Sequence, residues 1–173
     1  MPVKTPMYPE TNYPDLRVRW RFEELPEEFR EKIIKGEKIT GREVRKYLKR
    51  LFPKGKFKIK TNYSLKVTIF GGAGKEEVEK ALAEFNTKTS DAMIDYIGVI
   101  SHSVLMPDGS VKDIRFGWSL VCVEVDWETR QKLIEKALEE FHKKYPGNTK
   151  EEIREMFYSK AIELAENVLI KEL

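Results

Sequence analysis

The chain contains a single cysteine, Cys122, two histidines, His102 and His142, and one glutamine among its 173 residues. One cysteine excludes an intramolecular disulfide framework, and one cysteine with two histidines leaves almost no way to build a Cys/His zinc site. No apolar run reaches the length of about 18 residues that a membrane-spanning helix needs. The first residues also lack the apolar core of a signal peptide. We therefore expect a cytoplasmic protein that does not associate with a membrane.

Charge is abundant instead, and it is unevenly distributed along the chain. Hydrophobic residues make up 40% of the sequence and charged residues 35%, which indicates a folded globular protein. Many Lys and Glu residues with few amides are typical of proteins from hot environments. Residues 1–69 hold 18 Lys and Arg against 9 Asp and Glu, a charge of +9, whereas residues 70–173 hold 14 against 20, a charge of −6. A basic N-terminal half thus precedes acidic C-terminal helices.

The pattern of apolar residues predicts an extended arm followed by one domain. Residues 1–15 contain four of the eight prolines, which favours an extended arm, and we assign residues 16–173 to a single α+β domain. Strict alternation over residues 16–22 predicts a strand with three arginines on one face. Its opposite, apolar face consists of Leu16, Val18, Trp20 and Phe22.

The remaining elements are expected to be helices and two hairpins. Helices are predicted over residues 27–35, 40–51, 75–85 and 127–144, and a last helix from residue 149 nearly to residue 173. Alternating strands are predicted over 56–60 and 65–69, and strands that are apolar on both faces in places over 96–106 and 111–125. Tight turns join the strands in pairs, which favours antiparallel pairing. We therefore predict a two-layer α+β fold: an antiparallel sheet of two hairpins, with the strand over 16–22 as an added edge, packed with about five helices.

The segment 39–69 is the most strongly basic, with ten basic residues and one acid, Glu43. Thr40 and Glu43 form a capping-box pattern at the start of a helix. On one side of that helix a basic stripe is predicted, consisting of Arg42, Arg45, Lys46, Lys49 and Arg50. On the outer side of the following hairpin a lysine face is predicted, consisting of Lys56, Lys58, Lys60 and Lys66. Tyr63, in the turn of this hairpin, is a candidate for stacking on a nucleic-acid base.

The basic stripe and the lysine face need not form one surface. If the helix packs on the apolar side of the hairpin, its basic stripe and the strand lysines point in opposite directions. Basic blocks attract polyanions and release counterions when they bind them. A solvated, lysine-rich surface has the same composition and remains the alternative interpretation.

Two other motifs are weaker candidates for chemistry. The glycine-rich turn from Phe70 to Lys75 does not match a phosphate-binding loop, because Ile69 stands where the first glycine is needed and Glu76 replaces the hydroxyl residue. We interpret it as a strand-to-helix turn. Asp91 and Asp95 carry carboxylates in a polar segment that is more typical of a solvated loop than of a metal site. No metal or cofactor is therefore predicted.

The second hairpin raises the question of an acid–base site. With a two-residue turn at residues 108–109, His102 lies opposite Arg115, and Asp113 lies one step away on the same face. A structural histidine is the favoured interpretation, and a shift of one residue in register removes the cluster. We assign no catalytic residue, and an enzyme such as a nuclease that uses His102 ranks last among the functions considered.

Residues 43–85 resemble a known small module. The shared pattern is a helix ending in Leu-Lys-x-x-Phe-Pro, then Lys-Phe-x-Ile-Lys, a second strand and a helix ending in Phe, which correspond here to 48–53, 56–60, 65–70 and 75–85. This pattern is similar to the large polyvalent-protein-associated domains of phages and conjugative elements. The resemblance implies a mobile genetic element of a virus or plasmid, where DNA handling and counter-defence are common, and it carries over no catalytic residues.

Two hypotheses for function follow from the sequence. The first is a nucleic-acid-binding accessory protein that contacts phosphates of DNA or RNA through the basic stripe and the lysine face, with little sequence specificity. The alternative is a protein–protein adaptor or inhibitor of the counter-defence type, whose acidic C-terminal helices bind a protein partner and whose basic half only adds solubility. The sequence is compatible with a homo-oligomer under either hypothesis.

Overall fold

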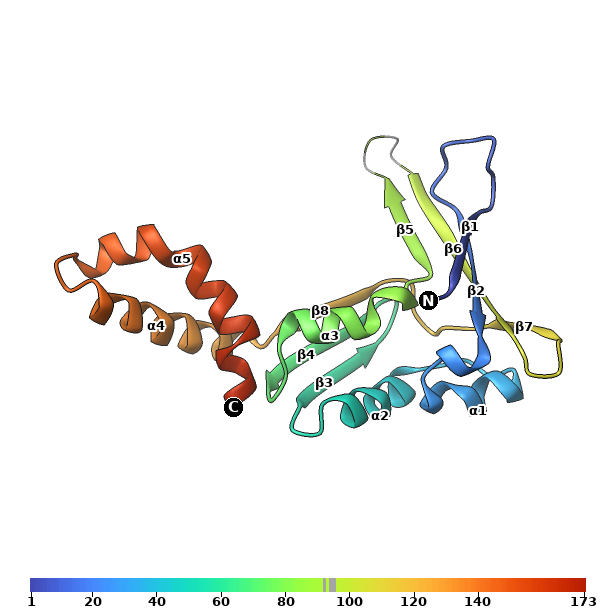
Figure 1. Ribbon diagram of the computed structural model, residues 1–173, viewed down its shortest axis with the longest axis horizontal. Coiled ribbons are helices and arrows are strands. Elements are labelled where there is room, and N and C mark those ends of the chain that lie inside the picture. The colour runs from blue at the N-terminus through green and yellow to red at the C-terminus, as the bar shows by residue number, and fades with distance from the viewer. Residues whose placement is uncertain (92, 94–95) are drawn as a thin grey trace. The chain divides into compact units, whose positions relative to one another are not determined.

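The computed structural model describes residues 1–91, 93 and 96–173, and its fold class is α+β, as predicted (Figure 1). The strands are β1 (Val3–Pro6), β2 (Leu16–Arg21), β3 (Lys56–Thr61), β4 (Leu65–Gly71), β5 (Lys88–Asp91), β6 (Tyr96–Leu105), β7 (Val111–Ile114) and β8 (Val121–Val125). The α-helices are α1 (Glu27–Lys35), α2 (Gly41–Leu51), α3 (Lys75–Leu82), α4 (Trp127–Lys144) and α5 (Lys150–Asn167). Among the described residues, none of these helices is both long and apolar enough to cross a bilayer.

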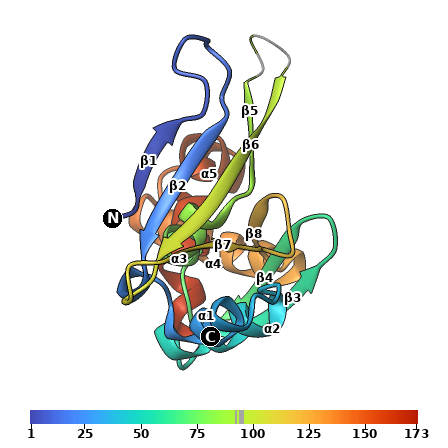
Figure 2. The ribbon, with the colours of Figure 1, turned by 90° about the vertical axis from the view of Figure 1, so that its right-hand side faces the viewer.

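The larger sheet is mixed rather than antiparallel. Its strands follow the order β1-β2-β6-β5, and β7 also pairs with β6. The strands β1, β2 and β6 lie side by side in Figure 2. β2 pairs with β6 in parallel, with Arg17 opposite Ser101, whereas the other three pairs are antiparallel. The expectation that residues 16–22 form a sheet edge is wrong, because β1 of the N-terminal arm covers the outer side of β2.

Polar contacts fix the arm against this sheet. Asp15 is 5% exposed, and its carboxylate accepts hydrogen bonds from the Val99 amide at 2.7 Å and the Tyr96 hydroxyl at 3.1 Å. The backbone carbonyl of Asp15 accepts a bond from the Met7 amide at 3.0 Å, and Tyr13 stacks on Tyr96. The proline-rich arm therefore consists of a paired strand and a loop held at its base by a buried carboxylate.

The smaller sheet has the order β3-β4-β8. Its burial alternates as the sequence predicts: Leu65, Val67 and Ile69 of β4 are fully buried, and the four side chains of the lysine face are exposed. Residues 111–125 do not form the single return strand that was predicted, because β7 stays in the larger sheet and β8 joins the smaller one. Between them the chain bonds to Ile39, whose amide donates to Arg115 and whose carbonyl accepts from Gly117.

Most helix ends lie where the capping signals predicted them. Gly36 ends α1 with a left-handed φ of 69°, a conformation that favours glycine. The Asp126 carboxylate accepts the Thr129 amide at the start of α4, and Thr149 and Glu152 form a capping box at the start of α5. The last helix is shorter than predicted, because α5 ends at Asn167 and a 3-10 helix over Leu169–Glu172 follows.

The described chain divides into two compact units, with residues 1–50, 59–66 and 82–122 in the first and residues 51–58, 67–81 and 123–173 in the second. The core of the first unit is aromatic, with Trp20 stacked on Phe85 at 5.3 Å and Phe85 packed on Phe116 at 5.6 Å. In the second unit α4 and α5 pack together, and Phe141 stacks on Phe157 with 4.4 Å between ring centroids. The assignment of residues 16–173 to a single domain stays a prediction.

A buried histidine connects the strands of the first unit. His102 is 5% exposed; its Nδ1 accepts a hydrogen bond from Trp20 Nε1 at 3.0 Å, and its Nε2 donates to the Asn86 carbonyl at 2.7 Å. The Asn86 side-chain oxygen in turn accepts the Val121 amide at 2.7 Å. Because the indole can only donate, Nδ1 has to stay unprotonated. Burial lowers the pKa of His102 below its usual 6.5, although the bond to Asn86 acts in the opposite direction.

We predict that acid weakens the fold through His102. Its folded-state pKa is lower than its unfolded-state pKa, so its contribution to stability is lost as the pH falls through 6.5 towards the folded-state value. The variant His102→Gln should be less stable than the parent at pH 7.5, by about 1–3 kcal/mol for a disturbed buried hydrogen-bond network. The difference should shrink as the pH falls to 5. Urea unfolding monitored by tryptophan fluorescence measures the free energy of unfolding of each protein at each pH, with His142→Gln as the matched control. A difference between His102→Gln and the parent that stays constant with pH contradicts the prediction.

Candidate nucleic-acid interface

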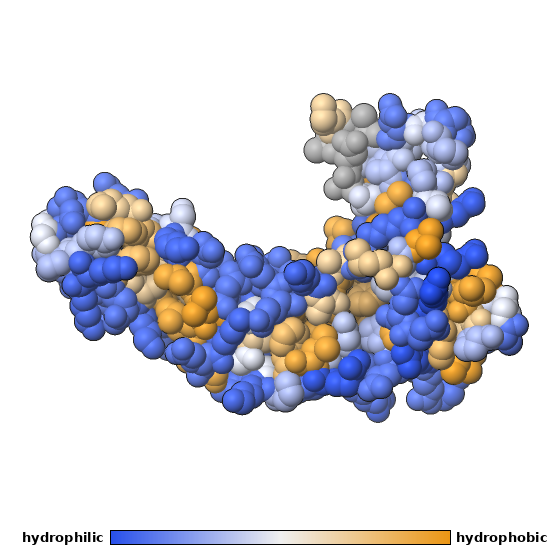
Figure 3. Space-filling view, in the orientation of Figure 1, coloured by the Kyte–Doolittle hydropathy of each residue, from blue (hydrophilic) through white to orange (hydrophobic). Residues whose placement is uncertain are grey.

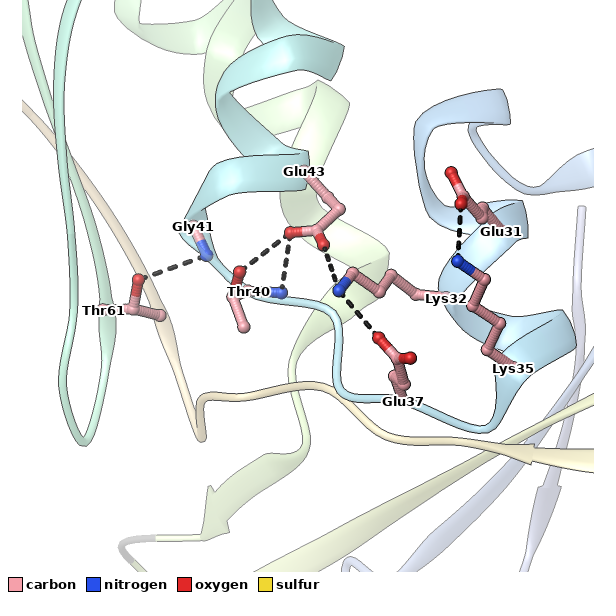
Figure 4. Close-up of polar contacts among 8 residues, drawn as sticks. All are labelled: Glu31, Lys32, Lys35, Glu37, Thr40, Gly41, Glu43 and Thr61. Atoms are coloured by element: carbon pink, nitrogen blue, oxygen red, sulfur yellow. Dashed lines mark hydrogen bonds and ion pairs between the residues drawn. The ribbon is translucent and has the colours of Figure 1, made fainter.

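The basic helix α2 is held at its first turn by a buried carboxylate (Figure 4). Glu43 is 5% exposed, and one of its oxygens accepts hydrogen bonds from the Thr40 hydroxyl at 2.8 Å and the Thr40 amide at 3.3 Å. Lys32 of α1 lies with Nζ 3.6 Å from the other oxygen and 2.9 Å from Glu37. Of the predicted capping box, the bond from the Thr40 amide to Glu43 is present, whereas the Thr40 hydroxyl donates to the same carboxylate and the Glu43 amide donates to the Thr40 carbonyl. An ion pair with Lys32 joins Glu43 to α1.

The ionised form of Glu43 suits this position. Burial on its own raises the pKa of Glu43, but the hydrogen bonds from Thr40 and the backbone, together with the charge of Lys32, outweigh it and lower the pKa below the usual 4.5. A negative charge in the first turn of a helix also interacts favourably with the helix dipole. Glu43, the lone acid of the basic segment, thus serves to position the helix.

A glycine brings the start of α2 close to β3. The Gly41 amide donates to Thr61 Oγ1 at 3.2 Å, and a Cβ at residue 41 would overlap that oxygen and lie 3.2 Å from Ile59 Cγ2. Ile59 and Thr61 are on the side of β3 opposite to Lys58 and Lys60, because side chains alternate along a strand. The start of α2 therefore lies on the apolar side of β3, opposite to the side that carries Lys60.

The basic stripe faces solvent, but its cations differ in their surroundings. The surface over α2 is largely hydrophilic in Figure 3, and all five predicted side chains are exposed. Arg50 is paired: its guanidinium contacts Glu28 at 3.1 Å and Glu27 at 3.2 Å and lies over the Tyr47 ring. The bond from Arg50 lowers the pKa of Glu28. Within the described ranges, Arg42 and Lys46 have no ion-pair partner.

Two members of the lysine face also lack an ion-pair partner. Lys58 and Lys60 alternate on the outer side of β3, and in the part of the chain that the structure describes neither forms an ion pair. Lys54, in the turn before β3, is likewise exposed and unpaired among these residues. Lys56 differs, because its Nζ donates to the Leu173 carbonyl at 2.6 Å. Tyr63 is 74% exposed in the β3–β4 turn.

The glycine-rich turn before α3 is a packing turn. A Cβ at Gly72, which has a φ of 74°, would overlap the Lys54 carbonyl. The first-turn amide of Glu76 donates to the Asn167 side chain at 2.9 Å, and Lys75 lies 3.7 Å from Glu166. Since the Glu76 amide and the Lys75 side chain already have partners within the protein, this helix start does not present those two groups to an anion. Nothing in the sequence indicates that Asn167, 91 residues away, caps the helix.

The proposed cluster of His102, Asp113 and Arg115 does not form. The turn is longer than two residues, so Leu105 pairs with Val111, and His102 lies opposite Ile114 rather than Arg115. His102 points into the core with both ring nitrogens bonded, whereas Asp113 and Arg115 are exposed. Of the two loop carboxylates considered for a metal, Asp95 lies outside the described residues. Within the described ones, no three His, Cys, Asp or Glu side chains are grouped as metal ligands.

Comparison with known proteins gives one finding. The family model described as large polyvalent protein associated domain 29 matches residues 36–128, which run from the end of α1 to the start of α4. The match includes the segment 43–85 on which the sequence resemblance depends and extends beyond it through β8. No curated protein and no solved structure matches the chain.

We predict that Glu43 is the main stabilising charge of this surface. Glu43→Ala should lower the free energy of unfolding by about 1–2 kcal/mol, because a capping interaction is lost and buried donors lose their acceptor. Its contribution requires the ionised form, so the loss should shrink as the pH falls below 4.5. Glu31→Ala is the matched control, since Glu31 is exposed and forms an ion pair with Lys35, which is also exposed. Urea unfolding of the two variants measures the difference, and equal losses contradict the prediction.

Proposed function

The chain belongs to the family of large polyvalent protein associated domain 29, and on this premise we propose that it is a small nucleic-acid-binding accessory protein of a mobile genetic element. The family name supports the setting, because it associates the domain with large polyvalent proteins. The chemistry that supports nucleic-acid binding comes from the chain itself. In this proposal, the basic stripe and the lysine face contact phosphates and make few contacts with the edges of the bases.

The observation that carries the proposal is a set of exposed cations that have no ion-pair partner within the described residues: Arg42, Lys46, Lys54, Lys58 and Lys60. A cation already paired with a carboxylate gains little from a phosphate, because the first partner has to be displaced. An unpaired cation neutralises a phosphate directly and releases a condensed counterion. Other charged side chains of the described residues form ion pairs, such as Arg50 with Glu27 and Arg154 with Glu135, whereas these five cations form none there.

The spacing of these cations suits a polyanionic strand. Arg42 and Lys46 are one helical turn apart on α2, so their Cβ atoms are about 5–6 Å from each other. Lys58 and Lys60 lie two residues apart on β3, which separates them by about 6.6 Å along the strand. Tyr63 extends from the turn beyond β3 and offers a ring face for stacking on an unpaired base. This combination favours binding of single-stranded nucleic acid to the lysine face.

The adaptor hypothesis draws on the second unit. There Trp127 is 68% exposed and Met156 of α5 is 59% exposed, on helices that are rich in acidic residues. Exposed aromatic and Met side chains are enriched in protein interfaces. An adaptor or inhibitor that binds a protein through α4 and α5, and binds no nucleic acid, is therefore the second candidate function.

We predict that nucleic-acid binding depends on the positions of these cations and not on the net charge of the protein. Fluorescence anisotropy with labelled duplex DNA, single-stranded DNA and structured RNA at about 0.1 M salt compares the parent with two double variants, Arg42→Gln/Lys46→Gln and Lys58→Gln/Lys60→Gln. The surface that binds should lose at least ~10-fold in affinity, because two phosphate contacts disappear. The lysine-face variant should have the larger effect on single-stranded DNA.

The matched control is Lys132→Gln/Lys136→Gln, which removes two exposed lysines of α4 and the same net charge. Its affinity should stay close to that of the parent. Equal losses of affinity in all three variants would mean that binding is a nonspecific attraction by net charge, which contradicts the proposal. If the parent binds none of the three nucleic acids, the adaptor hypothesis replaces it.

A further inference from the structure

The solvent-exposed face of the five-stranded sheet carries a second group of basic side chains. Arg17, Arg19 and Arg21 alternate along β2 on the side opposite to the buried Val18 and Trp20. The sequence predicts this alternation, but it does not indicate which side chains lie beside the arginines. The parallel pairing with β6 determines those neighbours.

Two rows of side chains meet across the middle of this face. In one row, Thr5 of β1, Arg17 of β2 and Ser101 of β6 are opposite one another, and in the next row Arg19 lies opposite Ser103. These five residues and Asp113 line an open hollow of about 650 Å³. Apart from His102, whose ring is bonded in the core, its polar side chains provide two guanidinium groups, three hydroxyl groups and one carboxylate.

The hydroxyl groups and arginines are arranged as ligands for an oxyanion. Arg19 Nε donates to Ser103 Oγ at 3.1 Å, which orients its guanidinium while the terminal N–H groups remain available. Among the described residues Arg17 has no bonded partner, and Ser101 beside it is exposed. Guanidinium groups bind phosphate oxygens through charge-assisted hydrogen bonds, and serine hydroxyls add neutral donors.

The third arginine of the strand lies in different surroundings. Arg21 lines a neighbouring hollow together with Glu23 and Glu24, and Arg19 lies at the border of both hollows. The Glu24 carboxylate accepts the Arg21 amide at 2.8 Å. Two carboxylates there repel an anion. In the hollow of Arg17 the one acid is Asp113, which lies opposite Ser103 and therefore in the row of Arg19, not in that of Arg17. Arg17 is thus the cation least compensated by acidic neighbours.

We propose that this hollow binds a phosphate group, with Arg17 as the main ligand and Arg19, Ser101 and Thr5 as supporting donors. The phosphate belongs to free inorganic phosphate or to a nucleotide. This site is distinct from the basic stripe and the lysine face, and it does not depend on nucleic-acid binding by either of them. Asp113 weakens the site, so that its affinity for a phosphate is set by the balance of two arginines against one carboxylate.

To test this, the full chain is titrated at constant ionic strength with inorganic phosphate, with a nucleoside monophosphate and with the same nucleoside without phosphate. Each titration is monitored by ¹H–¹⁵N NMR. Saturable shifts of the Arg17, Ser101 and Ser103 amides are expected with the first two ligands and not with the third. Arg17→Gln should weaken binding by at least ~10-fold, the effect of one lost charge-assisted bond. Asp113→Asn should tighten it, because a repelling charge is removed.

Arg21→Gln is the matched control, since it removes the same charge from the same face of the same strand outside the hollow. An equal loss in Arg17→Gln and Arg21→Gln overturns the proposal, as does an equal response to the nucleoside without phosphate. Ser101→Ala provides a second, charge-neutral variant, which should weaken binding without changing the net charge. Tighter binding of the monophosphate than of inorganic phosphate identifies a nucleotide as the ligand; equal binding identifies the phosphate group alone.

Discussion

The hydrogen bonds of His102 hold the first unit together, and the basic face of its sheet depends on them. An indole N–H in an aromatic core is costly unless it finds an acceptor, and Trp20 finds it in His102 Nδ1. The same ring donates to Asn86, whose side chain binds the start of β8. One imidazole thus fixes β2 beside β6 and anchors the segment before β5. Because β2 pairs in parallel with β6 at this point, its arginines face the serines of β6 on the outside.

The surfaces considered for binding are positioned by a few local contacts. Glu43 and Thr40 fix the first turn of α2, and Gly41 lets that turn approach Ile59 and Thr61 of β3. These contacts use the side of β3 that carries no lysine. The result is a strand with an apolar side covered by a helix and a lysine side left to solvent. Charge on the exposed side then costs no desolvation, which explains how so many cations are tolerated close together.

Much of the local structure could be predicted from the sequence, because it depends on neighbouring residues. Short-range rules account for the bond from the Thr40 amide to Glu43, the left-handed glycine at 36 and the alternation along β2, β3 and β4. The partners of strands distant in sequence could not be predicted. The parallel pairing of β2 with β6, and the division of residues 111–125 between two sheets, depend on contacts such as that of Ile39 with Gly117. The register of β6 and β7 likewise depends on one additional turn residue, which separates His102 from Arg115. For the candidate interface, the sequence identified which cations are exposed, but not that Arg50 is paired with Glu28.

In the proposed function, exposed cations on α2 and β3 that have no ion pair among the described residues contact the phosphates of nucleic acids. The most direct test of this claim is the salt dependence of binding by the parent protein. We predict that the logarithm of the affinity falls linearly with the logarithm of salt concentration, with a slope of about 0.9 per phosphate contacted on a duplex and about 0.7 on a single strand. Three or more contacts are expected from the cations that have no ion pair among the described residues. Binding that does not change with salt, or no binding at the lowest salt, would contradict the claim.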